Sequence, residues 1–454
     1  MFLEEKRRTF ETSILGSTII HTVEPKNIQA MMVTQFGDFE LGKMRRGVLF
    51  PLIGNGISAT DGKTWEHNRA MLRPLFVRAQ MVDVELEEKH TQNLFRQLPN
   101  NKDGWTNPVN ITQMLFQFTL EFSTELLFKT TVHSQSSSSL QILSAKPTKS
   151  FTSQDLAKNL DEATQHLQKR FSLLDLYWLH NPKSFQKKNI KDIHRFINLC
   201  IEGDVQRTRQ QENRELESKQ DSGFLNALFK KTEDPTELRN QLLNILIASR
   251  DTTTSLMSWT FWLLAKHPEI YNKLRSHIIT HVGSDDQANQ ITFERLNSCR
   301  YLQFVMKEVL RLYPPIAINS RKATQDTKLP LGGGSDEQSP IFLKEGQVVI
   351  FYAHITHTLR EFWGPDANNF DPDRWADQKS TWAYLSFSGG PRICLGQQSA
   401  LAEAGYLITR MLQRFDRAKL ADPHASAAHR PSTTDSPADY MIYFHEAPTG
   451  TTLG

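Results

Sequence analysis

Cysteine is scarce in this 454-residue chain, which has only Cys200, Cys299 and Cys394 and no Cys-x-x-Cys pair. An odd, widely spaced set of thiols argues against a disulfide framework, and a cysteine-rich zinc site needs paired ligands. The chain also lacks a large excess of either charge, because it has 53 Lys and Arg residues and 50 Asp and Glu residues. A formal net charge of +3, spread along the sequence, gives no basic field that would steer the chain to nucleic acid.

Long hydrophobic runs are missing as well. The longest apolar stretches, Leu242 to Ala248 and Leu256 to Ala265, fall well short of the roughly 20 residues that cross a bilayer. Residues Met1 to Thr12 are charged and lack the apolar region of a signal peptide. The sequence therefore predicts an intracellular chain with no transmembrane segment and no signal peptide.

A large buried core is expected, since 39% of the residues are apolar over a length that allows one large domain or up to three. Short β-like runs occur near Ser17 to Val23 and after Pro330, and the low-complexity segment Ser134 to Ser139 reads as a surface loop. Helical periodicity dominates elsewhere, which predicts a mainly α protein with a small β portion. Helices are predicted at Trp65 to Phe76, Val82 to Phe95, Ile111 to Phe128, Leu156 to Leu167, Ile190 to Ile201 and Phe224 to Phe229.

The longest predicted helix runs from about Pro235 to Lys266, with Asp234 as its cap, and ends before Pro268. Its length would be about 48 Å. Its middle is apolar on nearly every face, as in a helix buried through a large domain. Polar residues nevertheless occupy its centre, at Arg250 to Thr254. Burying a carboxylate and hydroxyls there is costly, so these residues call for a functional reason.

Two histidines, His354 and His357, stand three residues apart. No carboxylate follows in the place that a zinc protease would need. Ordinary packing or surface roles are the expectation for both.

Cys394 lies in a different setting, a loop rich in Gly and Pro before a helix predicted at Gln397 to Phe415. The amino-terminal end of a helix favours a thiolate. Gly390 and Gly396 would let the backbone approach a flat ligand closely. Arg392, two residues before the thiol, could reach a carboxylate at the edge of that ligand.

The run from Phe387 to Gly396 resembles the haem-thiolate signature F-x-x-G-x-R-x-C-x-G of the cytochrome P450 family. All fixed positions match, at Phe387, Gly390, Arg392, Cys394 and Gly396. The resemblance implies the cytochrome P450 fold as a single domain over residues 1–454. It also implies haem b (heme b, iron protoporphyrin IX) as cofactor, bound in part by Phe387, Arg392 and Gly396, with Cys394 as the ligand of the iron.

Glu308 and Arg311 resemble the family's E-x-x-R pair, at a spacing that places both on one helix face. Arg374 resembles the third member of the same buried ion network. Alone, each pair would be an exposed salt bridge worth about 1 kcal/mol or less. Together with the cysteine signature, they imply a structural network.

Trp65 and Arg69 resemble the family's helix that binds a haem propionate, and Arg321 resembles a further propionate ligand. Propionates are buried anions, so Trp and Arg donors suit them.

Residues Ala248 to Thr253 resemble the family's oxygen-activation segment. Ala248 and Thr252 share one helix face and would leave a groove over the haem. By resemblance, Asp251 and Thr252 would deliver protons through water. Ser249 departs from the family's Gly at its position, and its hydroxyl could narrow the groove or alter its water.

Within the family, Trp65 to Phe76, Tyr177 to Lys183, and Leu331 to Gly334 with Ser339 to Phe342 look most like the fungal branch of alkane and fatty-acid hydroxylases. The resemblance implies insertion of one oxygen atom from O₂ into an apolar, lipid-like substrate, with electrons from NADPH-cytochrome P450 reductase. Alternatives are tailoring oxidation of a fungal secondary metabolite, a reductase-independent isomerase or dehydratase, and a degenerate haem-binding protein.

The anchor helix of the family's microsomal members is not present before the first β region. Either the chain is truncated or it contacts the membrane through apolar surface such as Leu173 to Leu179. The expected place is the cytoplasmic face of the endoplasmic reticulum, peripherally bound, or the cytoplasm.

Overall fold

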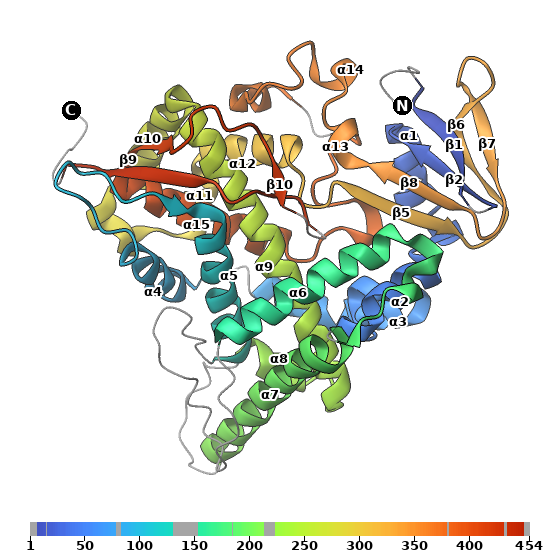
Figure 1. The fold of residues 1–454 in the computed structure, drawn as a ribbon, viewed down its shortest axis with the longest axis horizontal. Helices are drawn as coiled ribbons and strands as arrows, with labels where there is room; N and C mark the ends of the chain where they lie inside the picture. Colours follow the sequence, from blue (N-terminus) through green and yellow to red (C-terminus); the bar gives the residue numbers. More distant parts are fainter. Residues whose placement is uncertain are drawn as a thin grey trace. The chain divides into compact units, whose positions relative to one another are not determined.

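The computed structural model describes residues 7–14, 16–78, 83–129, 153–183, 185–212, 223–378, 381–430 and 434–448 (Figure 1). Helices account for most of these residues and strands for a smaller part, which confirms the mainly α class with a small β portion. The loop predicted at Ser134 to Ser139 lies outside them. Within the described ranges, we find no helix with the length and hydropathy that crossing a bilayer requires.

The chain forms two compact units, which are described separately below. Unit 1 comprises residues 1–43 and 303–397, and unit 2 comprises residues 44–302 and 398–454. The expectation of one domain over residues 1–454 stays a prediction.

Unit 1 contains a five-stranded sheet with the order β1-β2-β8-β5-β3. β2 and β8 pair in parallel, with Ile19 opposite Val348, and all other neighbours in this sheet are antiparallel. β6 and β7 pair as a separate antiparallel sheet. The bounds are β1 (Thr9–Ile14), β2 (Ser17–Thr22), β3 (Phe39–Glu40), β5 (Ile318–Ala323), β6 (Thr327–Gly333), β7 (Ser339–Leu343) and β8 (Val348–Tyr352).

The core of unit 1 forms where alternating apolar residues of this sheet meet short helices. Val349 and Phe351 of β8 are buried together with Ile28, Met31 and Leu385. Alternation along a strand places every second side chain on the core face, so the pattern of β8 suffices to orient it. The helical elements are α1 (Pro25–Gln29), the π-helix η1 (Ala30–Thr34), the 3₁₀-helix η2 (Phe36–Asp38), α12 (Arg300–Leu312), α13 (Ala353–Thr356), α14 (Arg360–Trp363), the 3₁₀-helix η7 (Pro372–Ala376) and the single turn η8 (Gly390–Arg392).

Unit 2 is mostly helical, with α2 and α15 beginning at its border. Its helices are α2 (Gly42–Ile53), α3 (Gly62–Arg78), α4 (Val84–Phe95), α5 (Ile111–Phe128), α6 (Ser153–Ser172), α7 (Lys191–Glu212), α8 (Phe224–Phe229), α9 (Pro235–Lys266), α10 (Pro268–His281), α11 (Phe293–Ser298) and α15 (Gln397–Arg414). Two small sheets join β4 (Val109–Asn110), β12 (Met441–Glu446) and β9 (Phe415–Leu420), and β10 (His429–Arg430) with β11 (Ser436–Pro437).

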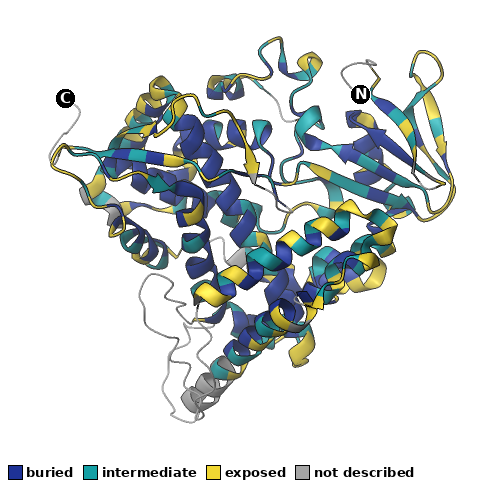
Figure 2. Ribbon diagram, viewed as in Figure 1, coloured by how far each residue is buried: buried dark blue, intermediate teal, exposed yellow. Residues whose placement is uncertain are grey.

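The long helix α9 has the bounds that the sequence predicts. The carboxylate of Asp234 accepts a hydrogen bond from the backbone N–H of Thr236 at 2.9 Å, and Pro235 occupies the first turn, where no N–H partner is needed. Buried residues are concentrated along α9 and α5 (Figure 2). The hydroxyls of Thr119 on α5 and Thr254 on α9 lie 2.8 Å apart, so the two helices also share a polar contact inside their apolar interface.

Candidate active site

A backbone hydrogen bond closes the loop that carries Cys394. The backbone N–H of Cys394 donates to the carbonyl of Phe387 at 3.0 Å, and α15 begins three residues after the thiol. Cys394 is exposed, whereas Cys200 and Cys299 are buried. Among the three thiols, only that of Cys394 is therefore accessible to a ligand of any size.

Gly390 is required in this loop for a reason that differs from the one the sequence suggested. Its φ is +64°, and a Cβ added to it would lie 2.0 Å from the carbonyl oxygen of Met32 on η1. Close packing against η1 and a left-handed backbone explain the glycine without any ligand. Ser388 also has a positive φ, of 62°, which a non-glycine residue adopts only where its surroundings hold it.

The side chains that flank the thiol suit a flat apolar group. Phe387, Arg392 and Gly396 are half-buried, and the apolar side chain of Ile393 beside the thiol is 40% exposed. An accessible thiol next to uncovered apolar surface, just before a helix, fits the thiolate side of a haem, because the helix dipole stabilises the sulfur anion.

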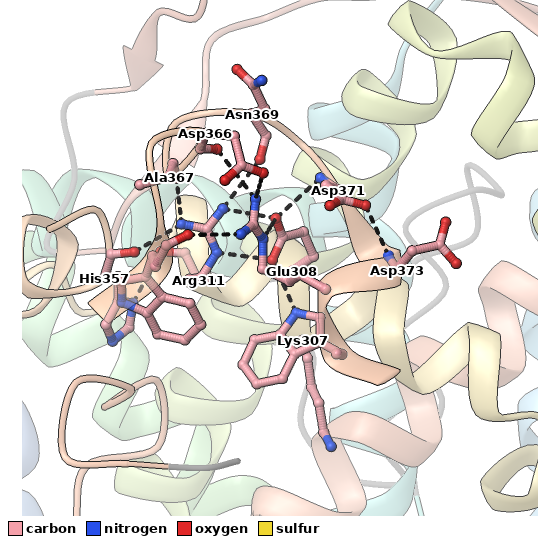
Figure 3. A network of polar contacts seen from close by, with 12 residues as sticks. Lys307, Glu308, Arg311, His357, Asp366, Ala367, Asn369, Asp371 and Asp373 are labelled. Atoms are coloured by element: carbon pink, nitrogen blue, oxygen red, sulfur yellow. Dashed lines mark hydrogen bonds and ion pairs between the residues drawn. The ribbon is translucent and has the colours of Figure 1, made fainter. Parts of the chain in front are cut away.

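Glu308, Arg311 and Arg374 form one buried network in unit 1, so the structure brings these three residues together. Figure 3 shows Glu308 and Arg311 within this network. The guanidinium of Arg311 binds the Glu308 carboxylate in a bidentate way, with N–O distances of 2.7 and 2.8 Å. Arg374 donates to the same carboxylate at 3.0 Å. Both Glu308 and Arg311 are fully buried, so their charges depend on each other.

Further donors and acceptors complete the network. The indole N–H of Trp375 and the backbone N–H of Asp371 donate to Glu308, at 2.9 and 3.1 Å. The Arg311 guanidinium donates to the carbonyls of His357 at 2.8 Å and Ala367 at 2.5 Å. A buried ion pair is stable only when its remaining polar atoms are satisfied, and here these atoms bond to the backbone of His357, Ala367 and Asp371 and to the Trp375 indole.

Arg321 lies on β5 and is buried. Its guanidinium donates to the carbonyl of Ser320 at 2.8 Å and lies 5.8 Å from the ring centre of Phe351. The structure thus fixes a cation in unit 1, and its role toward a propionate stays a prediction.

Trp65 and Arg69 meet on one face of α3 in unit 2. The guanidinium carbon of Arg69 lies 5.8 Å from the centre of the Trp65 ring, the geometry of a cation–π contact at i and i+4. Trp65 is buried and Arg69 half-buried. The helix therefore presents an indole and a guanidinium together, as the resemblance implies.

Ala248 and Thr252 form a less buried face at the centre of α9. Ala248 is exposed and Thr252 half-buried, although α9 is buried on both sides of them. The Thr252 hydroxyl donates to the carbonyl of Ala248 at 2.6 Å. Ala248 and Thr252 therefore lie on one face of α9.

Asp251 is buried and is held by its neighbour Arg250, whose guanidinium nitrogen lies 3.4 Å from the carboxylate oxygen. Arg250 also pairs with Asp161 on α6, and its guanidinium carbon lies 4.8 Å from the ring centre of Phe116. Burial alone would lower the pKa of Arg250, but the charges of Asp251 and Asp161 outweigh it and raise the pKa. Sequence reasoning missed Asp161, because no local pattern links residues so far apart.

Ser249 lies at the interface between α9 and α5. Its hydroxyl donates to the carbonyl of Ile245 at 2.9 Å and lies 3.0 Å from the hydroxyl of Ser123 on α5. The extra hydroxyl is thus bonded within the α5–α9 interface, so the concern that it narrows the face of Ala248 and Thr252 finds no support in this geometry.

Comparison with known proteins decides the family. The sequence profile described as "Cytochrome P450" matches residues 5–430. The chain belongs to the cytochrome P450 family. It is 40% identical over 427 residues to "Cytochrome P450 monooxygenase g430" from Fusarium sp, covering 93% of this chain and 74% of that protein.

Two further relatives carry the name cytochrome P450 52. The chain is 42% identical over 434 residues to "Cytochrome P450 52A13" from Debaryomyces hansenii (93% of this chain, 81% of the relative). It is also 42% identical over 423 residues to "Cytochrome P450 52A6" from Candida tropicalis (91% and 79%). These relatives confirm the resemblance to fungal members of the family, the haem cofactor and the class of monooxygenase.

Proposed function

We propose that this cytochrome P450 hydroxylates fatty acids or alkanes, with the thiolate of Cys394 as the ligand of the haem iron. The observation that carries the ligand assignment is the accessible thiol of Cys394 in a loop that its own N–H closes onto Phe387. When bound, a haem with a thiolate ligand supplies activation of O₂ and insertion of one oxygen atom.

Other residues hold the cofactor in this proposal. In unit 1, Arg321 and Arg392 would bind propionates, with Phe387 and Gly396 shaping the loop. By the resemblance to the family, Trp65 and Arg69 would bind a propionate, and Ala248 would leave space over one face of the ring. Buried or half-buried cations at these places lower the cost of burying two propionate anions.

Asp251 and Thr252 would move protons. The Thr252 hydroxyl donates its own hydrogen to Ala248, so its oxygen lone pairs can accept a hydrogen bond from water. Asp251 is held at a buried position by Arg250, and in this proposal its carboxylate exchanges a proton with such water.

The lipid-like substrate is supported by exposed apolar side chains in two apolar segments of the sequence, Phe50 to Ile53 and Pro315 to Ile318. Ile316 and Ile318, after Arg311, are 43% and 53% exposed, and Phe50 on α2 is 48% exposed. In the same segments Leu52 and Ile53 are buried and belong to the core. Burying each CH₂ of a ligand against hydrocarbon contributes about 0.8 kcal/mol, so affinity should rise with chain length.

A series of saturated fatty acids and alkanes of increasing length tests this substrate class. We expect progressively tighter binding in the substrate-induced spectral shift and oxidation at or near the far end. Flat affinity, with turnover only of a ring-bearing metabolite, would favour tailoring oxidation of a secondary metabolite instead.

A redox partner follows from the family, and we propose that it is NADPH-cytochrome P450 reductase. Turnover that requires reductase and NADPH supports the monooxygenase. Turnover of a peroxide without reductase would indicate the isomerase or dehydratase, and spectral binding without any turnover would indicate a degenerate haem protein.

Peripheral contact with the endoplasmic reticulum membrane is proposed at Leu173 to Leu179. Trp178 and Leu179 are 60% and 59% exposed. The segment is fixed to unit 2, because the Arg170 guanidinium lies 5.0 Å from the Tyr177 ring centre and donates to the carbonyl of Gly47. Apolar side chains on such a segment can enter a lipid interface, where binding strengthens with the apolar area that is buried.

Sedimentation with phosphatidylcholine vesicles checks this contact. Trp178→Ser with Leu179→Ser should lower the bound fraction several-fold. Phe342→Ser removes an equally exposed aromatic ring from β7, 60% exposed, and should leave binding unchanged. Equal loss in both variants would show that general surface hydrophobicity, and not this segment, drives binding.

A further inference from the structure

His357 is fully buried and bonded through both ring nitrogens, all within unit 1. Its Nδ1 lies 3.0 Å from the carbonyl oxygen of Arg311 at the end of α12. The backbone N–H of Leu385 reaches its Nε2 at 2.7 Å. The ring stacks on Tyr384, with ring centres 5.3 Å apart.

These two partners determine the protonation state of the ring. A carbonyl oxygen only accepts, so Nδ1 carries the hydrogen, and a backbone N–H only donates, so Nε2 offers its lone pair. His357 is therefore neutral and in one tautomer. Burial acts in the same direction, because it lowers the pKa of His357 to about 3.

Each partner of His357 belongs to a feature described above. On one side is Arg311, which donates from its guanidinium to the carbonyl of His357 at 2.8 Å, so the two residues are bonded in both directions. On the other side is Leu385, whose carbonyl accepts the N–H of Ser388 at 2.9 Å. The Cys394 N–H then closes the loop onto Phe387, two residues after Leu385.

A second bond holds the same segment to α12. The hydroxyl of Ser386 donates to the carbonyl of Leu310 at 2.9 Å. Leu385 and Ser386 are thus both fixed to the end of α12, one through the His357 ring and one directly. Ser388, with its positive φ, lies two residues after Ser386 and needs such support.

We propose that His357 is a positioning residue that connects the Glu308–Arg311–Arg374 network to the loop carrying Cys394. The proposal rests on the proposed role of Cys394 as the ligand of the haem iron. In this view the buried ion network stabilises the thiolate site through a specific hydrogen bond, from the Leu385 N–H to the His357 ring, and not only by stabilising the fold.

Two substitutions separate the two bonds of the ring. In His357→Asn the amide nitrogen occupies the place of Nδ1 and can still donate to the carbonyl of Arg311. The shorter side chain has no acceptor near the Leu385 N–H. In His357→Gln the longer amide reaches the place of Nε2 and can accept from Leu385. His354→Asn, three residues earlier within α13 and half-buried, is the matched control for a histidine loss in this segment.

The holoenzymes are compared by the rate at which the reduced carbon monoxide complex loses its thiolate-type absorption. We expect His357→Asn to lose it about tenfold faster than the unmodified chain, as for loss of one buried hydrogen bond, with His357→Gln and His354→Asn close to the unmodified rate. Loss in His357→Gln as fast as in His357→Asn, or no change in either, would overturn the proposal.

Hydrogen exchange of the backbone amides in 385–394 gives a reading that does not depend on the absorption band. These amides should exchange faster in His357→Asn than in His357→Gln, while the amides of α9 stay unchanged. Equal exchange in the two variants would contradict the positioning role. If Cys394→Ser kept the thiolate-type band, the ligand assignment alone would fail, since this exchange pattern reads the loop and not the iron.

Discussion

The guanidinium of Arg250 lies 3.4 Å from the carboxylate of Asp251, its neighbour in sequence. On its other side the same guanidinium pairs with Asp161 of α6, a carboxylate that is 35% exposed. Asp251, in contrast, is only 3% exposed. One buried cation is therefore shared between an inner carboxylate and a more accessible one.

Asp161→Asn should weaken proton delivery, because Arg250 would then be held by Asp251 alone and would bind it more strongly. We expect product per NADPH to fall about fivefold, the effect of roughly 1 kcal/mol on the barrier, and peroxide to rise. Asp155→Asn removes the same charge from the first turn of α6 and should change neither. An equal fall in both variants would assign the effect to the overall charge of the helix.

Cys394→Ser should abolish the thiolate-type absorption of the reduced carbon monoxide complex, because an alcohol is not a strong donor to the iron. Cys200→Ser and Cys299→Ser alter buried thiols and should keep the band. Survival of the band in Cys394→Ser, with its loss in either other variant, would move the ligand to another cysteine.

Thr252→Val preserves the shape of the side chain but removes the hydroxyl that bonds to Ala248. Electron use should continue, while product per NADPH falls about tenfold or more, since positioned proton transfer contributes at least that much. Thr253→Val makes the same change at a buried neighbour and serves as control. Unchanged coupling in Thr252→Val would leave Thr252 as a packing residue.

Glu308→Gln should be strongly destabilising, because the amide group would oppose two guanidinium donors with its own N–H bonds. Breaking a buried ion pair in this way costs about 3–5 kcal/mol. Trp375→Phe removes one hydrogen bond to the same carboxylate and should cost less, about 1.5–3 kcal/mol. Thermal unfolding of both, with exposed Glu345→Gln as control, checks the order. A ranking with Trp375→Phe more destabilised than Glu308→Gln would refute it.

Glu403 on α15 is buried, and burial raises its pKa from an ordinary 4.5 to about 8. Burial, followed by the charges of Glu403 and Asp83, also raises the pKa of Glu87 on α4. The folded chain therefore binds protons that the unfolded chain releases, so this contribution to stability is complete below about pH 4.5 and is lost as the pH rises to about 8.

Glu403→Gln should flatten this pH dependence, which melting temperatures at the acidic and alkaline ends of that window would show. The variant should gain stability relative to the unmodified chain at the alkaline end. Glu85→Gln, an exposed carboxylate on α4, should show no such gain. A parallel pH dependence in Glu403→Gln and the unmodified chain would place the titrating group elsewhere.

Helix ends were predictable where the sequence carries local signals. α9 begins at Pro235 after the Asp234 cap and ends before Pro268, and α5 and α8 also have the predicted bounds. Caps, prolines and apolar periodicity determine helix ends through residues that are close in sequence, so these ends can be predicted from the sequence alone. The same holds for the signature around Cys394, which is contiguous.

Contacts between distant segments were not predictable in this way. Asp161 reaches Arg250, and His357 reaches Leu385, through side chains whose partners no spacing rule defines. The sequence predicted close approach of a flat ligand at Gly390, whereas its contact with the carbonyl of Met32 comes from tertiary packing. A local motif can therefore indicate that a residue is important, but the residue that it contacts depends on the whole fold.

The parallel pairing of β2 with β8 also determines when unit 1 can form during synthesis. β2 leaves the ribosome early, but its partner β8 is made only after all of residues 44–302. Throughout that interval one edge of the β1–β2 hairpin remains open to other strands. Newly made chains are thus most exposed to wrong strand pairing before Val348 to Tyr352 emerges, and the whole five-stranded sheet is a late product of translation.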